Sequence, residues 1–291
     1  MAYRMHQGGG WQEPNTKLVG ENHPNGAIIN FYLKDLKDGD KVTLDILEMD
    51  GTLIRSYANT ASPDKMKPSS TQKLEVKKGG NRMVWNMRYP GYEEFKGMIF
   101  YSSPNVGPKV VPRDYKVRLT YNGNTMEQTF AIEKDPRIPN TQDDFQKQFD
   151  FLMAVRDQVT RANKAIINIR DIKKDLAYLK EKTMDNTEIK NLVDAFESEL
   201  SVIENNIHMT KNQSSQDPLN FGIRINNRLA FLLADSQRGD QRPTKQAEEF
   251  FGEVTKELDV QVNALNTLVK KQATAINEKA EENHIKMISM E

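Results

Sequence analysis

Hydrophobic and polar residues alternate one by one through much of the chain up to about residue 134. In the segment YKVRLTY, Tyr115, Val117 and Leu119 alternate with charged or hydroxyl-bearing residues. Successive side chains of a strand point to opposite faces, so this alternation predicts a strand with one buried face. The turn sequence NGN at 122–124 follows and leads into the alternating segment TMEQTFAIE. The two segments are therefore predicted to form a β-hairpin.

More strand candidates precede that hairpin. The segments KVTLDILE and TLIRSY flank Asp50–Gly51, which is a second hairpin signal, and GAIINFYL, TQKLEVK and RMVWNM continue the series. About seven short strands separated by turn residues are typical of an antiparallel β-sandwich of the immunoglobulin or fibronectin type III kind. The two sheets of such a sandwich bury their inner faces against each other, and the alternation supplies those faces.

A tryptophan marks the expected core of this sandwich. Met83, Trp85 and Met87 lie two residues apart and therefore share one face of a strand. A tryptophan flanked by apolar residues is more often part of a core than a platform for a ligand, so Trp85 is expected between the two sheets. The predicted structural core consists of Met83, Trp85, Met87, Tyr115, Val117 and Leu119.

Beyond residue 140 the apolar residues recur at the spacing of α-helices. Thr141 with Asp144 three residues later predicts a capped helix start, and Asp185 predicts a second one. A third helix is predicted to start at Asp217–Pro218 and to run on through Leu232, and a fourth follows RGDQRPT. Four helices, each with one apolar stripe, predict a long antiparallel four-helix bundle.

The predicted fold class is therefore α+β, with a β-sandwich followed by a helical bundle. A chain of 291 residues suits two domains. The expected divisions are a glycine-rich linker or extended arm at 1–25, the β-sandwich at 26–134, a linker at 135–140 and the helical bundle at 141–291.

Charge and cysteine content exclude several classes of function. Lysine plus arginine equals aspartate plus glutamate, 41 each, so no net field favours nucleic acid as a partner. The chain holds no cysteine, which excludes disulfides and a cysteine nucleophile. No apolar run approaches the roughly 20 residues that a membrane-spanning helix needs. The amino terminus also lacks the basic-then-apolar pattern of a signal peptide.

The passage after the predicted Trp85 strand is long for a loop and rich in aromatic residues. Long loops on rigid scaffolds often carry function, and exposed aromatic rings there would stack on sugar rings. The alternative is a loop that folds over the end of the sandwich and packs on the helices. The residues predicted to contact a ligand or partner are Tyr89, Tyr92, Phe95, Phe100 and Tyr101.

Six segments of the chain carry a family resemblance. They are NGAIINFYLKD, VTLDILEMDGTLIRSY, GGNRMVWNMRYPG, VPRDYKVRLTYNGNTMEQTFAIEKDPR, TQDDFQKQFDFLMAVRDQVTRANKAI and NNRLAFLLADSQRGDQRPT. Together they resemble, in the same order, the C-terminal region of large secreted proteins, common in the Bacteroidetes, that begin with sortilin-type or sialidase-repeat β-propellers. The likeness covers the chain from about residue 22.

This resemblance implies an extracytoplasmic location and a β-propeller elsewhere in the same precursor. Members are often labelled glycosyl hydrolases, but that label belongs to the propeller, and no propeller repeat occurs in this chain. The glycine-rich segment MHQGGGWQEPN is similar to a linker that follows a propeller. On this basis the chain is expected to be a fragment or a cleavage product.

No constellation of catalytic or metal-binding residues emerges from the sequence. His6, His23, His208 and His284 lie in different segments without the spacing of metal ligands, and each is expected to be solvated. The sequence RGD at 238–240 is expected to be a coincidence rather than an adhesion motif. Catalytic, cofactor-binding and metal-binding residues are all predicted to be absent, and no cofactor is expected.

Three functions remain open. The first is a noncatalytic accessory region that docks or spaces its partner, which would be the N-terminal β-propeller of the same precursor or a surface protein. The second is a carbohydrate-binding module that uses the aromatic loop at 89–101, with a glycan as its ligand. The third is a hydrolase-associated domain.

The helical core is expected to contain two polar positions, Asn226 and Asn227, whose amide side chains would fix the register of the helices.

Overall fold

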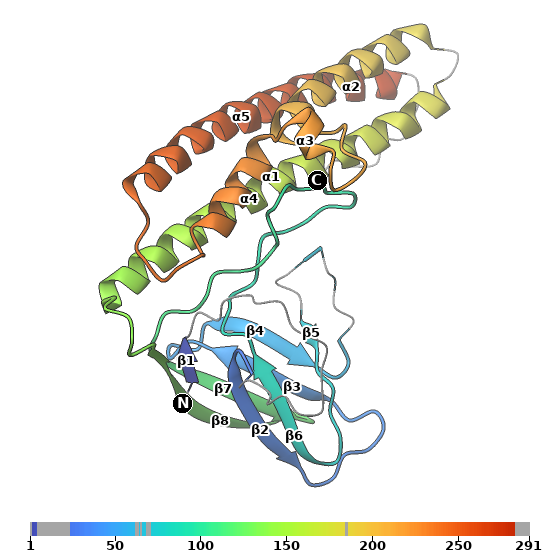
Figure 1. Ribbon diagram of the computed structural model, residues 1–291. Helices are drawn as coiled ribbons and strands as arrows, with labels where there is room; N and C mark the ends of the chain where they lie inside the picture. The colour runs from blue at the N-terminus through green and yellow to red at the C-terminus, as the bar shows by residue number, and fades with distance from the viewer. Residues whose placement is uncertain are drawn as a thin grey trace. The chain divides into compact units, whose positions relative to one another are not determined.

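The computed structural model describes residues 2–4, 24–61, 64, 66–67, 71–183 and 186–282. In this part of the chain the fold is α+β (Figure 1): β-sheets, mostly antiparallel, come first, and several long helices that pack together follow. The class predicted from the change of periodicity is confirmed at this level.

The described strands form two sheets. The larger sheet has six strands in the order β1-β8-β7-β3-β4-β5, and the smaller sheet pairs β2 with β6. Pairing is antiparallel except where β1 joins β8 and where β5 joins β4. The strands are β1 (Ala2–Arg4), β2 (Ala27–Leu33), β3 (Val42–Leu47), β4 (Leu53–Ala58), β5 (Gln72–Lys73), β6 (Gly79–Trp85), β7 (Asp114–Tyr121) and β8 (Asn124–Lys134).

Both predicted hairpins are present. Strands β7 and β8 pair from Asp114 with Ala131 to Tyr121 with Asn124. Asn122 and Gly123 between them have φ angles of 45° and 88°, the positive values that a tight hairpin turn requires at both central positions. Strands β3 and β4 pair across the predicted Asp50–Gly51 turn.

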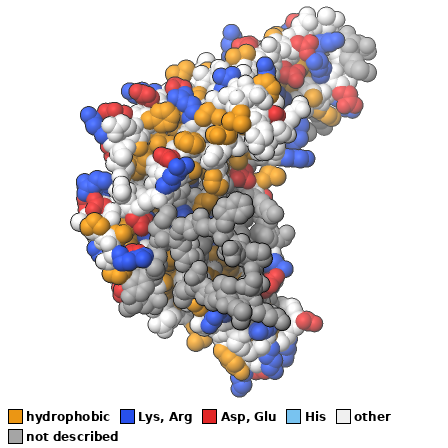
Figure 2. Space-filling view, in the orientation of Figure 1, with side chains coloured by type: hydrophobic (Ala, Val, Ile, Leu, Met, Phe, Trp, Pro, Cys, Tyr) orange, Lys and Arg blue, Asp and Glu red, His pale blue; other side chains and the backbone are white. Residues whose placement is uncertain are grey.

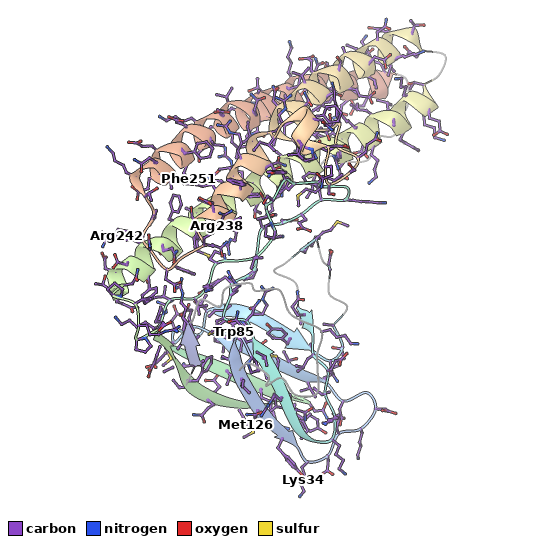
Figure 3. The ribbon with its side chains drawn as sticks, viewed as in Figure 1. Lys34, Trp85, Met126, Arg238, Arg242 and Phe251 are labelled. Atoms are coloured by element: carbon purple, nitrogen blue, oxygen red, sulfur yellow. The ribbon has the colours of Figure 1, made fainter. Side chains whose placement is uncertain are left out.

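The two sheets share one hydrophobic core, and Trp85 lies in it (Figure 3). Its side chain is fully buried, and its ring meets those of Tyr115 and Phe130 edge-on at centroid distances of 6.1 and 6.2 Å. Burying a large aromatic side chain among other rings contributes strongly to core stability. Tyr115 is also fully buried, whereas Met83, Val117 and Leu119 are partly buried against the same cluster.

Met87 is buried as well, although it lies beyond the strand on which the alternation placed it. Strand β6 ends at Trp85, and Met87 has a φ angle of 56°, which takes the backbone out of the extended region. Its carbonyl accepts a hydrogen bond from the Val110 amide at 2.9 Å.

The helices are α1 (Gln142–Lys182), α2 (Thr187–Ile207), α3 (Pro218–Phe221), α4 (Ile225–Asp235) and α5 (Lys245–Glu282). The capping pair at the start of α1 is confirmed, since the Asp144 amide donates to Thr141 Oγ1 at 3.2 Å and the Thr141 amide to Asp144 Oδ2 at 2.9 Å. The cap of α2 is Asn186, whose side chain accepts from the Ile189 amide. Asp185, the predicted cap, lies outside the described residues.

The prediction of one uninterrupted third helix is wrong. The segment that begins at Asp217–Pro218 forms a single helical turn, α3, and the chain leaves the helix at Gly222 with a φ angle of 75°. Glycine adopts such angles without steric cost and commonly ends helices. The apolar spacing continues across this break, which is why periodicity alone did not reveal it.

By its contacts the chain divides into two compact units. The first comprises Met1–Tyr92, Val106–Met153 and Ser236–Pro243, and the second comprises Glu93–Asn105, Ala154–Asp235 and Thr244–Glu291. The first unit therefore holds both sheets, and the second holds most of the helical residues together with part of the aromatic loop. Whether the chain separates at the predicted linker 135–140 is a question for proteolysis, and that boundary stays a prediction.

Within the second unit, α5 packs along α2 and α4. Each of these helices buries apolar side chains, among them Phe196 and Leu200 of α2, Leu229 of α4, and Val254 and Leu258 of α5. None of the described helices is long and apolar enough to cross a membrane.

Candidate functional site

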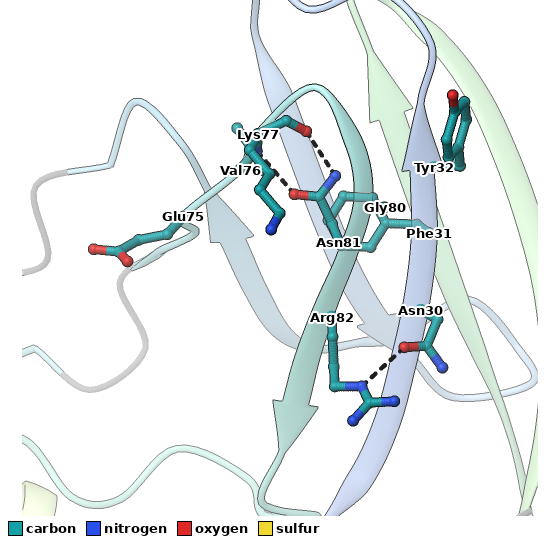
Figure 4. A pocket seen from close by; sticks show the side chains of 9 residues that line it. All are labelled: Asn30, Phe31, Tyr32, Glu75, Val76, Lys77, Gly80, Asn81 and Arg82. Carbon is teal, nitrogen blue, oxygen red and sulfur yellow. Dashed lines mark hydrogen bonds between the residues drawn. The ribbon is translucent and has the colours of Figure 1, made fainter.

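A hollow on the described surface lies beside β2 and β6 in the first unit (Figure 4). Its volume is about 850 Å³. Asn81 accepts a hydrogen bond from the Lys77 amide at 2.8 Å and donates to the Lys77 and Gly79 carbonyls, so it closes the turn before β6. The lining residues are Asn30, Phe31, Tyr32, Glu75, Val76, Lys77, Gly80, Asn81 and Arg82.

The polar groups of this pocket do not form an acid and base pair. Arg82 Nε donates to Asn30 Oδ1 at 3.2 Å, and Glu75 is the single carboxylate among the nine lining residues. General acid and base work on a glycoside needs two carboxylates that face each other across a cleft. The pocket therefore lacks the pair of carboxylates that a glycosidase uses, and it offers a polar surface beside β2 and β6.

The aromatic residues predicted to contact a ligand do not form an exposed platform. In the first unit, Tyr92 is fully buried and Tyr89 is half-buried, with its ring 5.0 Å from that of Phe149. The Tyr89 hydroxyl donates to Glu48, and burial together with this carboxylate raises the pKa of Tyr89. Both tyrosines thus belong to the interior of their unit.

In the second unit, Phe95 is buried, Phe100 is half-buried, and Tyr101 is 39% exposed. Phe95 lies between the guanidinium of Arg170, 4.6 Å from its ring centroid, and the ring of His208, 4.9 Å away edge-on. Stacking on a sugar needs an open ring face. Of the five predicted contact residues, Tyr101 is the one with more than a third of its surface exposed.

His208 is buried, so the prediction that it is solvated is wrong. Only 3% of its surface is exposed, and Phe95 and Phe100 cover its ring. Burial and the neighbouring Arg170 lower the pKa of His208 to about 4, so the imidazole is neutral at pH 7. The other three histidines lie outside the described residues.

A buried network of amides lies beside His208 in the second unit. Asn226 Nδ2 donates to Asn163 Oδ1 at 3.1 Å and lies 3.3 Å from His208 Nδ1. Asn163 Nδ2 donates in turn to the Glu93 carbonyl at 2.6 Å. Asn163 and Asn226 have no exposed surface. The network therefore joins α1, α4 and the end of α2 to the aromatic loop, in an environment where each lost partner is costly.

Asn227, the next residue, also holds the aromatic loop, because its side chain hydrogen-bonds to backbone groups of the loop. Its side-chain oxygen accepts from the Tyr101 amide at 2.7 Å, and its nitrogen donates to the Tyr101 carbonyl at 3.2 Å and to Ser103 Oγ at 3.1 Å. An amide side chain that pairs with both backbone groups of one residue imitates a strand partner. The prediction that Asn226 and Asn227 are polar core positions is confirmed.

The first unit has a buried charged cluster around Arg4. Its guanidinium donates to Asp240 Oδ1 at 3.2 Å, to the Val110 carbonyl at 3.0 Å and to Gln148 Oε1 at 2.8 Å, and it lies 5.0 Å from the ring centroid of Phe145. Burial lowers the pKa of Arg4, and Asp240 opposes that effect. Because Asp240 is the aspartate of the RGD sequence and is itself buried, it is not displayed for adhesion.

A groove on the helices of the second unit combines apolar and charged residues. It has a volume of about 410 Å³ and is lined by Asn206, Ile223, Arg224, Ile225, Arg228, Glu257, Val260 and Gln261. Arg228 and Glu257 form an ion pair at 2.6 Å across it. Val260 is 63% exposed. Figure 2 shows hydrophobic side chains on this part of the surface, over α4 and α5.

Among the described residues, no cluster of three or more histidine, aspartate or glutamate side chains could hold a metal ion. No known protein-family model matches the chain, and no curated protein matches it.

Sequence reasoning missed the residues at the centres of the two buried clusters. Arg4 lies in the segment expected to be a linker or extended arm, and its partner Asp240 is 236 positions away. Asn163 and Gln148 lie on α1 and were missed because a single polar residue within a helix produces no periodic pattern. His208 follows the last residue of α2 and reads as an ordinary helix end.

Proposed function

We propose that this chain is a noncatalytic accessory region of an exported protein that also carries a β-propeller, and that it docks on that propeller through its helices. In this proposal the sheets form an immunoglobulin-like or fibronectin type III-like sandwich and the helices form a four-helix bundle. The propeller and the extracytoplasmic location are inferred from the family resemblance described above.

The observation that carries the proposal is the groove of the second unit. Exposed apolar residues that line a groove with charged residues at its edge are typical of protein-binding surfaces. Ile223 and Val260 supply the apolar part, and the Arg228–Glu257 pair supplies polar contacts beside them. Val260 is an apolar residue of the amphipathic helix α5, yet 63% of its surface is exposed to solvent.

The buried polar groups support a structural role for the rest of the molecule. His208 is surrounded by the rings of Phe95 and Phe100, and Asp240 is paired with Arg4. A general base or acid must reach its substrate within hydrogen-bond distance. These two groups instead reach other side chains of the chain itself.

The alternative, a carbohydrate-binding module at the 89–101 loop, has less support. Tyr92 and Phe95 are buried, and Tyr89 is held by Glu48 and Phe149. A glycan platform would need these rings to be open to solvent. Tyr101 alone does not make such a platform.

The test combines gene context with one substitution. The precursor gene is expected to encode a signal peptide and a β-propeller upstream, and the separately expressed propeller is expected to bind this chain in an interferometry assay. The Val260→Glu variant should weaken that binding at least tenfold, because a charge would be placed in the apolar part of the groove. Val202→Glu is the matched control, since Val202 is 60% exposed on α2 and does not line the groove.

Two results would overturn the proposal. A precursor without a propeller would remove the partner. Equal binding by wild type and Val260→Glu would remove the groove as the contact, and glycan binding that is lost in Tyr101→Ala would favour the alternative.

A further inference from the structure

Strand β1 is three residues long, yet it carries the most deeply embedded charge of the first unit. The Arg4 side chain is 3% exposed, and each nitrogen of its guanidinium meets an acceptor: Asp240, Gln148 or the Val110 carbonyl. A short edge strand contributes little stability by its backbone alone. The side chain of Arg4 is therefore the main anchor of β1.

The acceptors around Arg4 are held in place by groups outside β1. Gln148 Nε2 donates to the Ser236 and Gly239 carbonyls at 3.1 and 2.7 Å, which leaves its Oε1 directed at the guanidinium. Asn140 Nδ2 donates to the Asp240 carbonyl at 2.6 Å and so fixes the backbone of the aspartate. These bonds do not involve β1, so the pocket is organised independently of the residue that fills it.

The backbone of β8 supplies the second half of the site. Ala2, Tyr3 and Arg4 pair in parallel with Ile132, Glu133 and Lys134, and β8 has β7 as its other neighbour. An extended segment that adds to a sheet edge gains affinity from main-chain hydrogen bonds and specificity from side-chain pockets. Both the main-chain pairing with β8 and a pocket for a side chain are present at this edge.

The pocket is chemically selective for a guanidinium group. Its acceptors lie in three directions, a carboxylate, an amide oxygen and a backbone carbonyl, and the Phe145 ring lies against the group. A planar fork of five N–H donors suits that arrangement, whereas an ammonium is a compact point charge with stronger hydration. Arg88 and Lys109 lie near enough to Arg4 to interact with its charge, so they would repel a cation that does not make all of these hydrogen bonds.

We propose that the edge of β8 and this pocket form a binding site for an extended peptide that carries one arginine, and that Ala2–Arg4 fills the site in the described structure. We call it the strand-acceptor site; its residues are Val110, Ile132–Lys134, Phe145, Gln148 and Asp240. A segment of the same chemistry from another chain competes with β1 for it. This inference is independent of the docking groove in the second unit.

The experiment uses the full chain with Arg4→Ala, which empties the guanidinium pocket, and a labelled peptide with the sequence MAYRMHQ. Fluorescence anisotropy should show saturable binding to this variant and at least tenfold weaker binding to the wild-type chain, where β1 competes at high effective concentration. The same peptide with lysine in place of arginine should bind at least tenfold more weakly. Arg137→Ala is the matched control, because Arg137 pairs with Asp135 near the end of β8 and is largely exposed.

Each outcome decides the question. If Arg4→Ala is unfolded alone, recovery of its circular dichroism on addition of the arginine peptide, and not of the lysine peptide, supports the site. Absence of binding and of recovery overturns it, as does equal affinity for the two peptides. Adding Asp240→Asn to Arg4→Ala should remove the preference for arginine, and an unchanged preference would also contradict the site.

Discussion

The two units bury polar side chains in different ways. The first unit buries a charged pair, Arg4 and Asp240, which joins its N-terminal strand to the segment before α5. The second unit buries neutral groups, the amides of Asn163 and Asn226 beside an imidazole that is uncharged at pH 7. Both clusters tie a loop or short strand to a helix. The comparison suggests that the first depends on keeping two charges together, whereas the second depends on keeping one group neutral.

The largest expected effect follows from breaking the charged pair. Asp240→Ala leaves the buried Arg4 guanidinium without a carboxylate, and Arg88 and Lys109 nearby add like charge. Removing one partner of a buried ion pair typically destabilises by about 3 to 5 kcal/mol. Urea denaturation of the full chain would measure this loss. Asp259→Ala, at the partly exposed Arg161–Asp259 pair, is the control and should change the free energy of unfolding by less than about 1 kcal/mol.

A loss as small as that of the control would show that the Arg4 pair contributes no more than a surface ion pair. The two clusters would then not differ in the way described above.

The second effect concerns pH and the neutral imidazole. The pKa of His208 is lowered from 6.5 to about 4 in the folded chain, so the unfolded chain binds more protons between these values. The stability associated with neutral His208 is therefore complete above about pH 6.5 and is lost as the pH falls toward about 4. The loss at the acid end is roughly 3 kcal/mol, by the rule of 1.36 kcal/mol for each pKa unit.

The control for this prediction is the variant His208→Gln. The slope of its free energy of unfolding against pH is compared with the slope for wild type. The charged groups near His208 are Arg170 and Glu204. Burial favours the protonated form of Glu204, but hydrogen bonds from Lys173 and Arg170 outweigh this and lower its pKa. Identical slopes for the two proteins between pH 6.5 and 5 would show that His208 is not the neutral buried group described here.

A smaller effect is expected at the loop that the amides hold. Asn227→Ala removes the partner of both backbone groups of Tyr101 and of Ser103 Oγ. Leaving buried polar groups unpaired costs about 1 to 3 kcal/mol. Hydrogen exchange at the Tyr101 amide should accelerate together with the loss of stability. Asn206→Ala, at an exposed amide, is the control, and protection of Tyr101 that survives in Asn227→Ala would contradict the assignment.

Regular elements were predictable because their signals are local. The β7–β8 hairpin follows from alternation and from the Asn122–Gly123 turn, and the start of α1 follows from Thr141 and Asp144. The break at Gly222 was missed because apolar residues keep helical spacing on both sides of it. A glycine within a helical pattern is a weak signal, since tertiary packing decides whether the helix continues.

The buried clusters were not predictable because their partners are distant in the sequence. Arg4 and Asp240 are 236 positions apart, and nothing in either local segment indicates that they meet. His208 gave the opposite error, because a histidine at a helix end is usually solvated, and only the arrangement of Phe95 and Phe100 over it removes it from water. Asn226 and Asn227 were found because two amides interrupt an apolar stripe, which is a local irregularity.

The smallest expected effect tests whether the charged cluster behaves as a buried one. Raising the ionic strength from about 0.1 M to about 1 M shortens the screening length from about 10 Å to about 3 Å, which weakens exposed ion pairs but not pairs shielded from water. The side chains of Arg4 and Asp240 are 3% and 7% exposed, whereas those of Arg161 and Asp259 are 37% and 45% exposed. The stability difference between wild type and Asp240→Ala should therefore stay constant across this range to within about 0.5 kcal/mol. The smaller difference for Asp259→Ala should shrink toward zero, because salt screens the attraction between Arg161 and Asp259.

Parallel urea titrations of wild type, Asp240→Ala and Asp259→Ala at both ionic strengths measure the two stability differences. If the Asp240→Ala difference declined with salt in the same proportion, water and ions would have access to the Arg4 pocket, and the charged cluster would differ from the amide cluster in composition but not in its isolation from solvent.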